Sequence, residues 1–76
     1  MNRTRRKQIT SIIDAIEQAK ADLDLVKDEE QDAFDNLPES IQDSERGHRM
    51  TAAIEAIDEA FEAIDTALNA LESAKE

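Results

Sequence analysis

The sequence has no cysteine, tryptophan or tyrosine, and only one glycine and one proline among its 76 residues. Without cysteine it can form neither a disulfide framework nor a thiolate zinc site. A β fold with many turns needs more glycine and proline than this. The longest apolar runs are two or three residues, so we expect neither a transmembrane helix nor the core of a signal peptide. The length allows one domain, spanning residues 1–76.

Positive charge is also scarce. Nineteen acidic residues against nine basic ones give a net charge of −10, and no lysine or arginine lies between Met50 and Ala74. Such a surface repels anionic membranes and the phosphates of nucleic acids, which argues against direct binding of either. We therefore expect protein partners, basic ones above all. The absence of cysteine is compatible with a reducing cytoplasm.

The clearest pattern present is a seven-residue repeat in the second half. Its large apolar residues are Met50, Ile54, Ile57, Phe61, Ile64, Leu68 and Leu71, in alternating steps of four and three. This spacing is typical of a helix that packs as in a coiled coil. Alanines beside these positions widen the apolar stripe and favour helix. The pattern predicts a helix over about residues 45–74.

The first half has the same spacing, in Ile9, Ile12, Ile16, Ala19, Leu23, Val26, Glu30, Ala33 and Leu37, with Ile13 and Phe34 beside it. Pro38 disfavours helix just before it, which predicts a helix over about residues 4–36 and a loop over residues 37–44. Pro38 can start a short helical turn that buries Ile41, and Asp43 or Ser44 can cap the second helix.

Two helices of equal length with a short connection predict an all-α, antiparallel, coiled-coil-like hairpin. The numbers of facing residues should add up to about 83, which places Val26 opposite Ile57. Two helices alone bury little apolar surface. We therefore predict a homodimer, in which two hairpins pack into a four-helix bundle. A monomer or a different partner chain is the alternative, and the relative direction of the two hairpins stays open.

Two polar features in the helices suggest chemistry. Glu45 and His48 have the Glu-x-x-His spacing of di-iron bundles, but no facing carboxylate shares their level. We interpret His48 as a solvated side chain and expect no metal and no cofactor. Glu30, on the apolar stripe, is expected to pair with Arg49 or Arg46, or to specify the register or the oligomeric state. With no nucleophile–base arrangement and no phosphate-binding glycine loop, the chain is predicted not to be an enzyme.

The acidic outer face of the second helix is the candidate partner-binding site. Its central residues are Glu55, Asp58, Glu62 and Asp65. Unpaired like charges weaken a helix, so a function is one explanation for them. This face would contact a basic protein surface, as a mimic of nucleic acid does; a solubilising role and adaptation to high salt are the alternatives. If the face only solubilises, the alternative contacts are Arg5, Arg6, Arg46 and Arg49.

The loop over residues 35–47, together with the Arg5-Arg6-Lys7 start and the acidic, alanine-rich repeat, resembles small acidic α-helical proteins of bacteriophages and prophages, mostly uncharacterised. The resemblance implies no particular activity; by association it favours a location in the bacterial cytoplasm and inhibition of a host defence or nucleic-acid-binding protein. It assigns no functional residue. The alternatives are a small RNA-binding regulator of the Rop type, which would need a basic helix face, and a purely structural dimerisation module.

Overall fold

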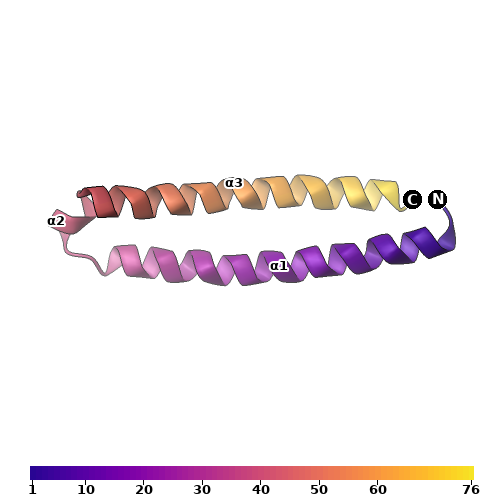
Figure 1. Ribbon diagram of the computed structural model, residues 1–76, viewed down its shortest axis with the longest axis horizontal. Helices are drawn as coiled ribbons and strands as arrows, with labels where there is room; N and C mark the ends of the chain where they lie inside the picture. Colours follow the sequence, from indigo (N-terminus) through magenta and orange to yellow (C-terminus); the bar gives the residue numbers. More distant parts are fainter.

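The computed structural model describes all 76 residues, and the fold is a helical hairpin. Its elements are α1 (Arg3–Asp35), the short α2 (Glu39–Gln42) and α3 (Glu45–Ala74), with no strand. The two long helices run antiparallel side by side, α2 lies at the turn, and both ends of the chain lie together at the opposite, open end (Figure 1). The predicted all-α antiparallel hairpin is confirmed. The first helix begins and ends one residue earlier than expected, and the last spans the expected residues.

Local side-chain contacts explain where the long helices begin. The side chain of Asn2 accepts a hydrogen bond from the Arg5 amide at 2.8 Å, which satisfies one free donor of the first turn of α1. Of the two caps considered for α3, Ser44 is the one used, and its hydroxyl accepts from the Gly47 amide at 3.5 Å. Pro38 immediately precedes α2, as expected for the start of a short helical turn.

The turn is clamped onto both long helices. The Gln42 side-chain amide donates to the Phe34 carbonyl of α1 at 3.0 Å, and the Ser44 hydroxyl donates to the Ile41 carbonyl of α2. Gly47, in the first turn of α3, is buried under this segment: a Cβ there would lie 2.0 Å from the Gln42 carbonyl oxygen. Only glycine allows this approach. Ile41 is half-buried, so it is less enclosed than predicted.

The hairpin is a thin rod with little interior. It measures 58 × 15 × 11 Å, and its radius of gyration is 17.3 Å. A compact domain of this length has a radius of gyration of about 11 Å. Only three of 76 residues are buried, Ile13 and Ile54 at 4% and 8% exposure and the glycine of the turn. A single hairpin therefore does not enclose its apolar side chains.

The side of α1 that faces α3 agrees with the prediction in part. Two rows of α1 are buried or half-buried: the predicted row Ile9, Ile16, Leu23, Glu30 and Leu37, and a second row of Ile13, Lys20, Lys27 and Phe34. In place of the row that contains Lys20 and Lys27, the prediction had the residues one position earlier. Of these, Ile12 and Val26 are 50% and 52% exposed. Val26, which was predicted opposite Ile57, is therefore less enclosed than expected.

The physical reason lies in the two lysines. The apolar stripe of α1 is wider than one neighbouring helix can cover, so apolar burial alone leaves the rotation of α1 undetermined. Lys20 and Lys27 both form ion pairs with α3. These pairs favour the rotation that brings the lysines to the interface and leaves part of the stripe outside.

Candidate functional site

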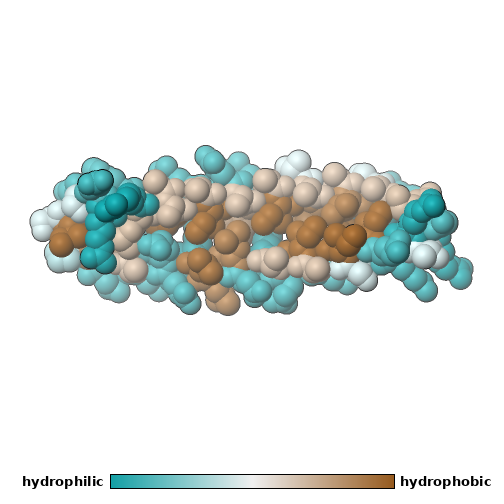
Figure 2. All heavy atoms as spheres, in the orientation of Figure 1, coloured by the Kyte–Doolittle hydropathy of each residue, from teal (hydrophilic) through white to brown (hydrophobic).

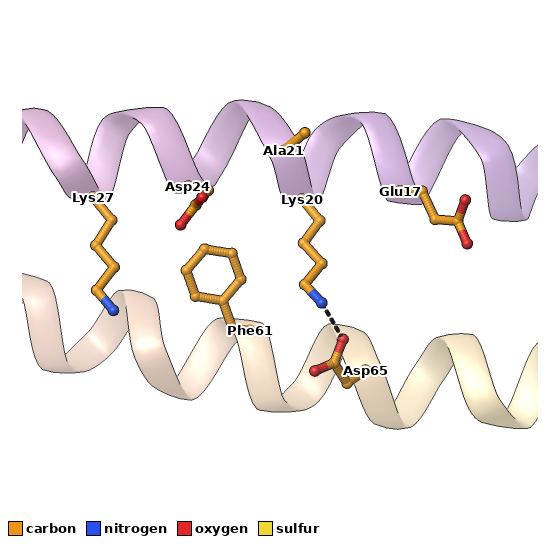
Figure 3. Close-up of a pocket in the computed structure, with 7 residues that line it drawn as sticks. All are labelled: Glu17, Lys20, Ala21, Asp24, Lys27, Phe61 and Asp65. Carbon is orange, nitrogen blue, oxygen red and sulfur yellow. Dashed lines mark hydrogen bonds and ion pairs between the residues drawn. The ribbon is translucent and has the colours of Figure 1, made fainter.

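Two ion pairs bridge the long helices along one face of the hairpin. Lys20 Nζ lies 2.6 Å from Asp65 Oδ1, and Lys27 Nζ is hydrogen bonded to Asp58 Oδ1. Figure 3 shows the first pair, with Phe61 between the two lysines. In both pairs the residue numbers add up to 85, close to the predicted value of about 83.

Lys27 interacts with both an aspartate and an aromatic ring of α3. Its hydrogen bond with Asp58 raises its pKa above the ordinary value of 10.5, partial desolvation opposes the rise, and the nearby carboxylates of Asp58, Asp24 and Asp28 add to it. The ammonium also lies 5.8 Å from the centre of the Phe61 ring, within the range of a cation–π interaction. Lys27 is therefore held in its charged form at neutral pH.

These residues line a shallow groove of about 470 Å³. Its lining consists of Glu17, Lys20, Ala21, Asp24, Lys27, Phe61 and Asp65. The lysines are neutralised by their aspartates, and partly exposed ion pairs of this kind contribute little to stability. The groove has the chemistry of a hairpin interface.

The acidic residues chosen from the sequence divide into two kinds. Asp58 and Asp65 are paired with lysines of α1, so the expectation that the carboxylates of this helix are unpaired is wrong for these two. Glu55 and Glu62 are exposed and form no ion pair. The predicted register already places both lysines within two positions of these aspartates, so the signal for the pairing lies in the other helix.

The opposite face of the hairpin is apolar. Its exposed or half-exposed residues are Ile12, Ala19, Val26 and Ala33 of α1 and Ala53, Ala60 and Ala67 of α3, named here the apolar face. Each lies one position before a residue that faces the other helix, so it is rotated by about 100° out of the interface. Because the helices are antiparallel, this rotation leads to the same face of the hairpin on both.

The two faces can be compared in the figures. Figure 2 shows a band of apolar side chains that runs along most of the rod, over and between both long helices. Figure 3 shows the hairpin from the side opposite to that of Figure 1. In Figure 3 α1 lies above α3, whereas in Figure 1 it lies below, and Glu17 is on the side of the open end in a view whose open end has not changed sides. The charged groove therefore lies on the face away from the viewer of Figure 2. The hairpin has one charged and one apolar face.

The other polar candidates stay apart from one another. Glu30 is half-buried and makes no ion pair, so its expected pairing with Arg49 or Arg46 does not occur within the hairpin. No group of three histidine, aspartate or glutamate side chains comes together to hold a metal ion, and Glu45 and His48 gain no further partner.

The basic residues named as alternative contacts form no common patch within one hairpin. Arg5 and Arg6 lie at the open end, where Arg6 Nη2 donates to the Glu76 backbone oxygen at 3.5 Å. Arg46 and Arg49 lie in the first turns of α3, near the opposite end of the rod.

Neither long helix has a stretch apolar enough to cross a lipid bilayer. The chain matches no protein-family model, no curated protein and no solved structure.

Proposed function

We propose that this chain is a non-enzymatic, protein-binding helical hairpin whose apolar face packs against a second copy to form a four-helix bundle. The observation that carries the proposal is the apolar face itself, where Ile12 and Val26 are half-exposed. The exposed area of the chain is 5567 Å². A compact protein of this mass exposes about 4,700 Å². The excess of about 900 Å² is close to the roughly 800 Å² that each partner buries in an interface of standard size.

The acidic surface of α3 stays outside such a bundle and is proposed as the second binding surface. Glu55 and Glu62 are exposed and form no ion pair. The neighbouring Asp58 and Asp65 are each paired with a lysine of α1. Their field reaches about 8–10 Å in physiological salt, far enough to steer a basic protein into contact. From the resemblance to phage proteins, we propose a host defence or nucleic-acid-binding protein in the bacterial cytoplasm as the partner.

Self-association is tested with two neighbouring substitutions. Leu25 and Val26 are both exposed, at 63% and 52%, but only Val26 belongs to the apolar face. Val26→Asp should therefore shift sedimentation equilibrium toward monomer, because it would bury a charge between the copies. Leu25→Asp is the matched control and should leave the dimer intact. Monomeric sedimentation of the native chain would refute the proposal.

Two double variants that remove the same charge from different helices test the acidic surface. Glu55→Gln/Glu62→Gln should lower binding to a lysine-rich histone, used as a basic probe, and the native complex should weaken as salt is raised. Asp22→Asn/Glu29→Gln removes the same charge from exposed positions on α1 and should lower binding less. Equal losses in both variants would mean that net charge alone acts, which leaves a purely structural dimerisation module as the function.

A further inference from the structure

We propose that the two hairpins pack head to tail, so that the turn of one copy lies beside the open end of the other. This inference rests on the self-association proposed above and adds its direction. In this arrangement α1 packs antiparallel against α1 of the second copy, and α3 packs against α3. The alternative places turn beside turn and packs α1 against α3 of the second copy. Three features of the chain distinguish the two.

The first feature is the alternation of size along the apolar face of α1. The row reads Ile12, Ala19, Val26, Ala33, large and small in turn. When two such rows run antiparallel, Ile12 lies opposite Ala33 of the second copy and Val26 opposite its Ala19, and both pairs of numbers add up to 45. A large side chain then faces a small one at every level, which keeps the distance between the helices constant.

The turn-beside-turn arrangement packs this row less evenly. From the register of the two ion pairs, Ala19 and Ala33 would lie nearest Ala67 and Ala53 of the second copy. Small residues would then face small ones at these two levels, whereas Ile12 and Val26 would hold the helices apart at the others. Gaps between the copies would result, and unfilled space loses packing energy. In the head-to-tail bundle, by contrast, the row of α3 contains only alanines, and Ala60 and Ala67 of the two copies lie within two positions of the same level, which allows a close pair.

The second feature is the charge at the two ends of the rod. Residues 28–49, at the turn, hold eight acidic and two basic residues, a net charge of −6. Residues 1–14 and 65–76, at the open end, hold five basic and four acidic residues, a net charge of +1. Head-to-tail packing brings each −6 end next to a +1 end. Turn-beside-turn packing brings the two −6 ends together, where they repel.

The third feature is Glu30, which is half-buried beside the apolar face and has no cation within its own hairpin. Turn-beside-turn packing puts the Glu30 carboxylates of both copies at the same level of the bundle, where burial strengthens their repulsion. In the head-to-tail arrangement, Glu30 lies level with residue 15 of the second copy. The two carboxylates are then about 22 Å apart along the bundle, from a rise of 1.5 Å per residue.

Disulfide trapping tests the direction, because the native chain has no cysteine and each engineered thiol is unique. Ala19→Cys is mixed with Val26→Cys in one sample and with Ala67→Cys in another, both in a glutathione redox buffer. Each chain carries one thiol, so every mixed disulfide joins two copies, and their different masses identify it. Disulfides need Cα atoms within about 4.4–6.8 Å, so the 19–26 product should exceed the 19–67 product at least about tenfold. Sedimentation equilibrium of the native chain is measured in parallel.

The outcomes separate this inference from the self-association on which it rests. Predominance of the 19–67 disulfide would overturn the head-to-tail direction and leave the dimer standing. A dimeric native chain that forms neither disulfide would also overturn it, since the copies would meet through another surface. A monomeric native chain would refute the proposed self-association itself.

Discussion

Gly47 is the residue whose replacement tests the described turn most sharply. A Cβ at this position would lie 2.0 Å from the Gln42 carbonyl oxygen, 2.5 Å from the Gln42 carbonyl carbon and 2.7 Å from the Ile41 carbonyl oxygen. All three atoms belong to the backbone, so no side-chain rotation relieves the clash. In Gly47→Ala, α2 must therefore move away from α3 by more than 1 Å to restore an ordinary contact of about 3.4 Å.

Two opposing effects determine the free energy of unfolding of Gly47→Ala. Alanine stabilises a helix by about 1 kcal/mol relative to glycine. Overpacking costs about 1–3 kcal/mol. Moving α2 also weakens the hydrogen bonds that Gln42 donates to Phe34 and Ser44 to Ile41, each worth about 1 kcal/mol. We expect a net loss of about 1–3 kcal/mol, a large part of the roughly 4–11 kcal/mol available to a chain of this length.

The assay is urea unfolding followed by helical circular dichroism, at one fixed chain concentration because association contributes to apparent stability. His48→Ala is the matched control, because His48 is the exposed next residue of the same helical turn. This variant should gain a few tenths of a kcal/mol from helix propensity alone. If Gly47→Ala were as stable as His48→Ala, the close approach of α2 to α3 would be refuted.

Two further predictions concern the helix interface. The raised pKa of Lys27 means that its ion pair stabilises the fold fully below about pH 10.5 and that this stability is lost as the pH rises through the higher pKa of the folded state; urea midpoints of the native chain should therefore fall more steeply above that pH than those of Lys27→Gln, and parallel curves would contradict this. Ile57→Asp and Leu68→Asp place a charge at half-buried positions of α3 and should abolish the helical signal at micromolar concentration, whereas Glu59→Asp, at an exposed position of the same helix, should not.

Sequence patterns predicted the backbone well because local rules act strongly there. Pro38 ended the first helix and Ser44 capped the last, both as a consequence of backbone chemistry within a few residues. The rotation of α1 could not be obtained in this way. Its apolar stripe includes both Ile12 and Ile13, and the aspartates that pair with Lys20 and Lys27 and favour one of the two sides lie across the hairpin on α3.

The role of Gly47 was missed for a related reason. Within its own helix a glycine only weakens the structure. Its value appears when α2 folds back onto α3 and its carbonyls need the space that a Cβ would occupy. The pairing of two carboxylates of the acidic surface was missed for the same reason, because the lysines that neutralise them lie some 30 to 45 residues away in the chain.

The clamped turn also determines the order in which the hairpin closes. The bond from Gln42 to Phe34 spans eight residues, whereas the contact of Arg6 with residue 76 at the open end spans 70. Closing the longer loop from the unfolded chain costs about 2 kcal/mol more in entropy than closing the shorter one. Folding is therefore fastest when α2 forms its contacts first and the long helices then zip together toward the termini. The same order in reverse makes the open end the first part of the rod to separate, so amide protons there should exchange with solvent sooner than those beside the turn.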